Sequence, residues 1–543
     1  MLKVTKVIYS GLRHSFRTNK ITISQYKFRP IQHIPKFYFQ SCPTNHNNQD
    51  PQKIYQEGIN KFDQGKYDES ISLLQEFINS QNNTDPAKIE VVEANERIGS
   101  ALYHQKKFKD SFGYFKYALE TREKFFPDNK NEIIRDLNIL AMLCDHSQQH
   151  QEAIEYNEKL LSIAKETLGE NDPFIVNVCL NLGGLFEKTK NYSSAVDYYS
   201  YSLNLAKQRF GDHHPSLAVI YQNLGNAYMK MSEYILAVEE YLKCVEIITI
   251  NYGENHASIP GLYLSISDVY RFQKKYQYAL EFGLNALESI VKQYEPDHPS
   301  VLPYYLQIAV VYLEMRDFNK AIDFCEKFLT IQKSSGIENS KSALALSYIG
   351  TALDGLGNYN EGLKSHEKAL NLALNASSCK KDDNSLSKIY FNLGQNYLLQ
   401  KDLPKALENI EQSLKILKKI HGEDSENLLD CLCSLCQIYS EMGKFEEAIK
   451  NGNKAVRITK KNKKSKWNLA KALEYLGFAY YKQGDIETAL DNLSESEAIR
   501  SDFFQSDHIE FLGLYNKILK IYEENKDQQK IAEYTKKLNS IKT

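Results

Sequence analysis

Residues 182–202 read LGGLFEKTKNYSSAVDYYSYS, and this stretch decides the fold. It opens on a Leu-Gly pair, a small residue (Ala195) follows twelve positions after the glycine, and another (Ser202) follows seven positions later. Large rings, Phe186 and Tyr192, lie between the first two landmarks. Two helices cross at close range only where a side chain is minimal, and rings then fill the volume beside the crossing. The stretch therefore predicts an antiparallel helix pair joined by a tight turn.

The same pattern recurs along almost the whole chain. The residue that follows the first landmark leucine or isoleucine, here called the first crossing position, returns every 41 to 44 residues and is Gly99, Ala141, Gly183, Gly225, Ser267, Ala309, Gly350, Gly394, Cys436 and Gly477. The residue twelve positions later, the second crossing position, is Ser111, Ala153, Ala195, Ala237, Ala279, Ala321, Gly362, Ala406, Ala448 and Ala489. So regular a period indicates an array of similar helix pairs.

Two further units bracket these ten. Gly58 and Ser70 occupy the two crossing positions of an earlier unit, while Leu519 and Ile531 occupy those of a later one. Bulk at both crossing positions should hold the last helix pair further apart, as is tolerable in a terminal capping unit. The length from residue 52 to residue 542 accommodates about twelve units.

These landmarks resemble the tetratricopeptide repeat, whose units carry a Leu-Gly pair, a following aromatic residue, a central alanine and a later small residue. The usual unit has about 34 residues. The longer period of this chain, and linkers of the form Gly-acidic-x-His/Asp-Pro such as 169–173 and 211–215, resemble the kinesin light chain subclass. The resemblance implies an all-α fold, a right-handed α-solenoid of about twelve antiparallel helix pairs, over residues 50–543.

Residues 1–49 form a separate basic segment with eight lysines and arginines and no acidic residue. On a helical wheel, five of these charges fall in one arc and apolar residues occupy the rest; the charged residues are Lys3, Lys6, Arg13, Arg17 and Lys20. A basic, hydroxyl-rich and acid-free amphipathic segment is typical of a mitochondrial transit peptide, so we expect a mitochondrial protein. The alternative is a basic disordered tail that binds nucleic acid or anionic lipid in the cytosol.

Composition excludes several other classes. With 42% hydrophobic and 25% charged residues the chain can form a large core, which excludes wholesale disorder. No stretch approaches the roughly 18 to 20 apolar residues of a membrane span. From residue 50 onward 59 basic residues face 69 acidic ones, so the repeats should repel nucleic acid.

Motifs for catalysis, cofactors or metal ions are absent: the chain has no phosphate loop, nucleophile elbow, His-Glu-x-x-His or dinucleotide fingerprint. We therefore expect no enzyme, no cofactor and no metal. The nearest metal-like cluster is Cys431, Cys433 and Cys436. We interpret these thiols as small apolar residues in tight helix packing, with a metal or redox role as the alternative.

Two other recurring features belong to connections between units. The histidines of the linkers are too far apart for one metal ion, and we interpret them as hydrogen-bonding linker residues; they are His213, His214, His256 and His298. A basic run precedes the only tryptophan, Trp467, and consists of Lys460, Lys461, Lys463, Lys464 and Lys466. A solvated loop explains this run, and contact with an anionic partner or lipid is the alternative.

The family resemblance also implies a binding groove. In the family, the first helix of each pair lines the inside of the superhelix, and residues two before and one after the first crossing position point into the groove. Carboxamides are frequent at these two positions: Asn181, Asn223, Asn226, Gln307, Asn392, Gln395 and Gln437. A carboxamide offers donors and an acceptor, so a ladder of them can pair with the backbone of an extended peptide. The alternative is that these positions are merely polar and solvated.

The ladder is interrupted where the position two before the crossing holds Ile139, Ser265, Tyr348, Ser434 or Tyr475. We therefore expect a selective groove around the fourth and fifth units. The combined prediction is a non-enzymatic scaffold or adaptor of mitochondria that holds peptide segments or subunits of a larger complex, with no nucleic-acid partner, and with membrane contact only through its partners. The alternative is a cytosolic cargo or cytoskeletal adaptor like kinesin light chain, although no heptad-rich coiled coil precedes the repeats.

Overall fold

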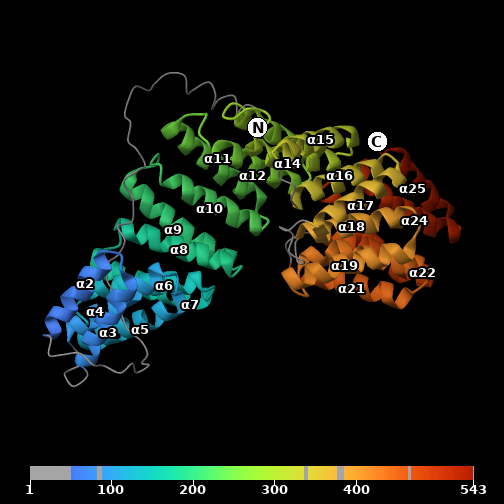
Figure 1. The fold of residues 1–543 in the computed structure, drawn as a ribbon. Coiled ribbons are helices and arrows are strands. Elements are labelled where there is room, and N and C mark those ends of the chain that lie inside the picture. Colours follow the sequence, from blue (N-terminus) through green and yellow to red (C-terminus); the bar gives the residue numbers. More distant parts are fainter. Residues whose placement is uncertain (1–49, 82–87, 336–339, 376–383, 463–465, 542–543) are drawn as a thin grey trace. The chain divides into compact units, whose positions relative to one another are not determined.

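The computed structural model describes residues 50–81, 88–335, 340–375, 384–462 and 466–541, and within these ranges the chain is helical without any strand (Figure 1). The basic segment 1–49 lies outside them. The helices are α2 (Pro51–Asp63), α3 (Tyr67–Ser80), α4 (Ile89–His104), α5 (Phe108–Phe125), α6 (Lys130–His146), α7 (His150–Leu168), α8 (Pro173–Lys188), α9 (Tyr192–Phe210), α10 (Leu217–Lys230), α11 (Tyr234–Tyr252), α12 (Ile259–Phe272), α13 (Tyr276–Val291), α14 (Leu302–Glu314), α15 (Phe318–Ser334), α16 (Ser340–Gly355), α17 (Tyr359–Asn375), α18 (Asn384–Leu399), α19 (Leu403–His421), α20 (Leu429–Glu441), α21 (Phe445–Asn462), α22 (Lys466–Gln483), α23 (Ile486–Ser501), α24 (Leu512–Glu524) and α25 (Gln528–Asn539). Short 3-10 turns, Pro299–Val301, Glu426–Leu428 and Ile509–Phe511, precede α14, α20 and α24.

These helices form the twelve consecutive pairs that the sequence predicts, which confirms the all-α repeat fold. In each repeat the even-numbered helix is the first helix and the following odd-numbered one is the second helix. The described residues divide into two compact units: unit 1 ends at Asn191 and unit 2 begins at Tyr192. In the described residues, unit 1 contains α2 to α8 and unit 2 contains α9 to α25.

The small residues lie where the two helices of a repeat approach most closely. Ser111 on α5 donates its Oγ hydrogen to the carbonyl of Gly99 on α4 at 3.0 Å, so side chain and backbone are in direct contact across the pair. A Cβ atom built on Gly225 would lie 2.7 Å from the ring of Tyr241. As the sequence pattern predicts, small residues at the crossing positions allow the backbone of one helix to contact a side chain of the other helix directly.

The turn between the two helices of a repeat has a fixed geometry. At eight turns a non-glycine residue adopts a left-handed backbone conformation, for example Lys190 with φ 63° and Lys274 with φ 61°. Helix α8 ends at Lys188, and the backbone amide of Asn191 donates to the carbonyl of Phe186 at 2.8 Å. This amide satisfies a carbonyl group that the end of α8 would otherwise leave open. Non-glycine residues rarely adopt a positive φ. Because a positive φ recurs at the same place in eight repeats, the repeat structure must impose this turn conformation.

The linker histidines form hydrogen bonds, as predicted. The ring of His214 stacks on Phe210 with centroids 4.6 Å apart, and its Nδ1 atom accepts from the amide of Ser216 at 3.2 Å. His256 and His298 repeat both contacts with their own neighbours. His213 differs: in the described part of the chain its backbone carbonyl accepts a hydrogen bond from Asn251, and its ring forms none. Sequence inspection missed a further linker of this kind, in which His508 stacks on Phe504 and accepts from the amide of Glu510 at 3.3 Å.

Buried ionic clusters, which the sequence pattern does not reveal, join neighbouring repeats. In unit 1 the guanidinium of Arg122 bonds to both Glu96 and Asp136, and all three side chains are at most 1% exposed. In unit 2, Glu474 accepts from Arg500 and Lys517. Arg122 and Arg500 both lie in the last turn of a second helix, and each pairs with a glutamate three positions before a first crossing position. The two clusters thus use equivalent places in repeats two and eleven.

The last helix pair differs from the others in the residues at its crossing positions. Leu519 and Ile531 are half-buried at its crossing positions, and α24 and α25 make the least extensive contact of any pair whose two helices lie in one unit. The bulky side chains remove the close crossing that small residues permit. None of the helices in the described ranges combines the length and apolar character needed to cross a bilayer.

Candidate functional site

The candidate site is the surface formed by the two predicted groove positions on the first helices, here called the first-helix face. Asn181 lies on α8 in unit 1 and is exposed. The other six predicted residues lie in unit 2 and are half-buried, on α10, α14, α18 and α20. Each of the seven side chains therefore reaches solvent, as a binding residue must.

Four of the carboxamides have partners inside the protein. Gln307 donates to Asp268, Asn392 donates to the Oγ of Ser347 at 3.0 Å, and Gln395 donates to the Oγ of Ser434 at 2.7 Å. In all three cases the partner lies on the first helix of a neighbouring repeat. Asn226 differs, because it accepts at 2.7 Å from the hydroxyl of Tyr241 in its own repeat. Much of the ladder therefore also connects successive first helices.

These bonds leave hydrogen-bonding capacity unused. A carboxamide has two N–H donors and an oxygen with two lone pairs, and within the described part of the chain each of the four residues uses only one of these groups. Asn181, Asn223 and Gln437 make no hydrogen bond within the described residues. The first-helix face can therefore still bind a polar chain laid across it.

Charged side chains on the same helices are mostly paired between repeats. Arg271 on α12 donates to Asp268 at 3.0 Å and to Glu314 on α14 at 2.8 Å. Lys471 on α22 lies 2.7 Å from Asp430 on α20. The Arg271–Glu314 and Lys471–Asp430 pairs each bring opposite charges together on neighbouring first helices.

Two tyrosines occupy places where the carboxamide pattern lapses. Burial raises the pKa of Tyr348 to about 12 and that of Tyr475 to about 12, so both phenols stay protonated at neutral pH. A protonated phenol can donate a hydrogen bond while its ring packs against a partner. Ser434 also replaces a carboxamide at one of these positions. Its Oγ accepts the hydrogen bond from Gln395, so it is hydrogen-bonded to the carboxamide ladder.

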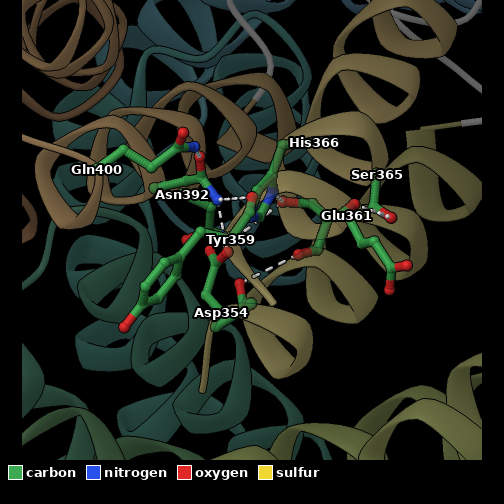
Figure 2. Close-up of polar contacts among 10 residues, drawn as sticks. Asp354, Tyr359, Glu361, Ser365, His366, Asn392 and Gln400 are labelled. Carbon is green, nitrogen blue, oxygen red and sulfur yellow. Dashed lines mark hydrogen bonds and ion pairs between the residues drawn. The ribbon is translucent and has the colours of Figure 1, made fainter. Parts of the chain in front are cut away.

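A buried polar network behind the first-helix face escaped the sequence analysis. His366 on α17 is fully buried, with Nδ1 3.2 Å from the Oγ of Ser347 and Nε2 3.1 Å from the carboxylate of Asp354, as Figure 2 shows for the histidine and the carboxylate. Asn392 joins this network through Ser347. The one signal in the sequence is that Gly362 replaces the usual alanine, since a Cβ there would lie 2.1 Å from Asp354 Oδ1.

The other candidate groups do not form a reactive site in the described residues. Cys431, Cys433 and Cys436 are at most 2% exposed, and burial raises the pKa of all three thiols, to about 11 for Cys431 and about 12 for Cys436. Buried protonated thiols fit the helix-packing interpretation. Within the described ranges no group of His, Cys, Asp and Glu side chains is placed to hold a metal ion.

The basic run before Trp467 lies partly outside the described residues, which exclude Lys463 and Lys464. Its described members approach acidic side chains: Lys460 lies 3.8 Å from Glu495, Lys461 lies 2.9 Å from Asp424, and Lys466 lies 3.0 Å from Asp502. All three pairs are exposed, but Lys460 and Lys461 lie on α21 and Lys466 begins α22, so these members of the run belong to helices and not to a loop.

Fold and site together define a helical repeat protein with a polar first-helix face. The family model of the tetratricopeptide repeat matches residues 90–166, 132–208, 174–250, 258–334, 341–419 and 385–461, and the chain belongs to this family. Tetratricopeptide repeats are protein-binding modules, so the array is a protein-binding scaffold.

One curated relative is the response regulator aspartate phosphatase E of Bacillus subtilis (strain 168), 34% identical over 147 residues. The match covers 26% of this chain and 37% of that protein, so it spans little more than a third of the relative.

Similar solved structures include a Rap protein complexed with competence and sporulation factor, at 12% identity and TM-score 0.46, covering 67% of this chain and 96% of that one. BtubC (BKLC) from P. vanneervenii matches at 14% identity and TM-score 0.35, over 42% of this chain and 91% of that one. Repeats of a putative kinesin light chain from Podosopora anserina match at 20% identity and TM-score 0.32, over 39% of this chain and 99% of that one.

Proposed function

We propose that this protein is a non-enzymatic adaptor of mitochondria that holds an extended peptide segment of a partner protein on its first-helix face. The observation that carries the proposal is the set of solvent-reaching carboxamides on α10, α14, α18 and α20 whose hydrogen-bonding groups are only partly used. An extended peptide exposes backbone N–H and C=O groups along its whole length, and carboxamides can pair with both kinds. Binding of this kind depends on backbone geometry more than on the side chains of the partner.

The internal bonds of the ladder support this assignment. Bonds such as Gln395 to Ser434 fix side chains that would otherwise lose rotamer freedom on binding. Ordering a flexible polar side chain at an interface costs about 0.5–1.5 kcal/mol. A ladder held in place before the partner arrives avoids part of that cost. A partner segment then adds hydrogen bonds to groups that are already oriented.

The two carboxamides of unit 2 that make no internal bond provide the direct test. Asn223→Ala combined with Gln437→Ala should raise Kd for a bound peptide by roughly 30-fold, because two neutral hydrogen bonds contribute about 2 kcal/mol together. The probe is a short peptide selected against the full-length protein from a random-sequence display library, and Kd is measured by fluorescence anisotropy.

The matched control replaces two asparagines of second helices. Asn409 and Asn451 donate only to carbonyls of their own helices, at 2.9 Å and 2.8 Å, so Asn409→Ala with Asn451→Ala should leave Kd within about twofold. Both double variants should keep the circular dichroism and melting of the parent protein. Equal binding by the Asn223/Gln437 variant and the parent would remove the first-helix face as the binding site.

The mitochondrial part of the proposal rests on the composition of residues 1–49. A fluorescent protein fused behind these residues should enter mitochondria, because a basic amphipathic segment is drawn inward by the membrane potential. The control fusion carries Arg13→Gln, Arg17→Gln and Lys20→Gln and should stay diffuse. If the unaltered fusion is diffuse in the cytosol, the cytosolic adaptor replaces the mitochondrial one.

A further inference from the structure

A continuous chain of hydrogen bonds runs from the first-helix face into the core of repeats eight and nine. Asn392 on α18 donates from Nδ2 to the Oγ of Ser347 on α16 at 3.0 Å. Ser347 Oγ lies 3.2 Å from His366 Nδ1 on α17, and His366 Nε2 lies 3.1 Å from Asp354 Oδ2. Figure 2 shows Asn392, His366 and Asp354 gathered at this point. Asn392 is half-buried, whereas Ser347 and His366 are fully buried.

The sequence of contacts corresponds to one assignment of hydrogens along this chain. In the His366 tautomer that carries its hydrogen on Nε2, the ring donates to the Asp354 carboxylate. In that tautomer Nδ1 accepts the hydroxyl hydrogen of Ser347. Ser347 has given up its only hydrogen and can take only a donor from Asn392. The carboxamide must therefore turn its NH2 group inward.

The buried end of the chain is held in place by packing. Asn396 donates to Asp354 Oδ1 and also, at 3.0 Å, to the backbone carbonyl of Tyr359. Gly362 leaves the space that the Asp354 carboxylate fills, and a Cβ on Gly350 would lie 2.7 Å from the ring of His366. The carboxylate and the ring occupy the volume that a side chain at Gly362 or Gly350 would fill. Hydrogen bonds to both oxygens of Asp354 hold the inner end of the chain.

The outer end of the chain is open. Asn392 Oδ1 accepts no hydrogen bond within the described residues, and it is not among the polar atoms enclosed there without a partner. Because Nδ2 faces Ser347, this oxygen is on the other edge of the amide group. It can accept a hydrogen bond from a molecule bound to the first-helix face.

We infer that Ser347 and His366 are positioning residues that make Asn392 present an acceptor, and not a donor, to the bound segment. This inference rests on the proposed function and adds a specificity to it: the partner segment must place a backbone N–H group opposite Asn392. A free asparagine on the surface could turn by half a rotation and satisfy either an N–H or a C=O group. The buried network removes that choice.

Backbone esters of the selected peptide test the inference, because an amide-to-ester change removes one N–H donor with little change in shape. In the parent protein one such change should weaken binding about tenfold, and the same change should have no effect on Asn392→Ala. That pairing identifies the N–H group opposite Asn392. In Ser347→Ala the penalty for the same ester should fall below about threefold, because the carboxamide is free to turn.

Controls separate orientation from stability. Thr351→Ala removes a neighbouring hydroxyl on α16 that bonds only the carbonyl of Ser347, at 3.1 Å, and should keep the full ester penalty. Ser347→Cys retains size and a weak donor, so it should give an intermediate penalty and replaces Ser347→Ala if that variant melts at a lower temperature. A merely structural role for Ser347 would lower all affinities without changing the ratio between amide and ester.

Two outcomes overturn the inference. One is an ester penalty of parental size in both Ser347 variants; the other is the lack of any ester whose penalty depends on Asn392. The variant with Asn223→Ala and Gln437→Ala separates these outcomes from failure of the proposed function. If that variant binds more weakly but Ser347→Ala keeps the full ester penalty, the first-helix face is still the binding site and only the fixed orientation of Asn392 is wrong.

Discussion

Replacing Arg122 with methionine is expected to lower the free energy of unfolding of unit 1 by about 3–5 kcal/mol. Arg122 is 1% exposed and bonds to Glu96 and Asp136, both of which are completely buried. Without the guanidinium, two carboxylates remain in the interior with only Arg135, at 3.2 Å from Glu96, as a partner. Removing one member of a buried ionic cluster leaves uncompensated charge, which is far more destabilising than losing an exposed pair.

The loss should depend on pH in a defined direction. Burial raises the pKa of Asp136 to about 6 even with Arg122 present, and its Oδ1 has no hydrogen-bond donor in the described residues. A carboxyl group whose pKa rises on folding stabilises the fold below its unfolded pKa of about 4 and loses that contribution as pH rises through the folded pKa. Removing Arg122 should raise this pKa further. The variant should therefore be closest to the parent near pH 5 and furthest from it above pH 7.

Hydrogen exchange of residues 89–146 is the suitable measurement, because repeat arrays open locally and a single global transition is not assured. Arg135→Met is the matched control: the Arg135 side chain is 25% exposed and bonds to Glu96, so its loss should be smaller than that of Arg122, because both buried carboxylates keep the Arg122 guanidinium. Equal protection of α4 to α6 in both variants would contradict the assigned role of Arg122.

The fold could be predicted from the sequence because its decisive residues are defined by size. Crossing positions such as Gly225 and Ala237 must be small, and this requirement recurs at a fixed interval, so one sequence contains many copies of the same evidence. The linker histidines were predicted for the same reason. Comparison of the repeats reveals the residue types that recur in all of them, and these shared residues are the ones that define the fold.

The ionic clusters and the His366 network could not be predicted, because each depends on residues that occur once. Glu96 and Arg122 are separated by 26 positions, and on their own helices both look like ordinary polar residues. His366 stands where other repeats have Tyr199 or Tyr241, a substitution with no pattern behind it. Only the packing of α16 against α17 and α18 shows that its ring meets Ser347 and Asp354.

The candidate site was predicted only in part for a related reason. Asn392 and Gln307 are at the expected positions, but a carboxamide in a sequence does not show which of its groups is used. Partners such as Ser347 and Asp268 lie 39 to 45 residues away, on the neighbouring first helix. Their distance in sequence is close to one repeat. A search for polar pairs one repeat apart would have found both contacts, and the direction of each bond follows only from the complete network.

Replacing Gly477 with leucine is expected to destabilise repeat eleven by about 3 kcal/mol. A Cβ atom at this position would lie 2.9 Å from the backbone carbonyl of Ala489 and 2.9 Å from Leu493 Cγ. Backbone cannot rotate out of the way as a long side chain can, so α22 and α23 must separate and lose core contacts. The gain in helix propensity on replacing glycine, about 1 kcal/mol, is too small to compensate.

The fluorescence of Trp467, the only tryptophan, can report the loss of stability in repeat eleven itself. Trp467 lies at the start of α22, with its ring 5.5 Å from that of Phe504 between centroids, so its fluorescence in urea reports the unfolding of repeats eleven and twelve. Gly261→Leu is the control, because a Cβ on Gly261 of α12 meets no atom within 4 Å. The Gly477 variant should unfold at a clearly lower urea concentration than the Gly261 variant. If the two transitions coincide, close approach at the crossing position is not what holds the helix pair together, and the physical basis of the repeat pattern itself is wrong.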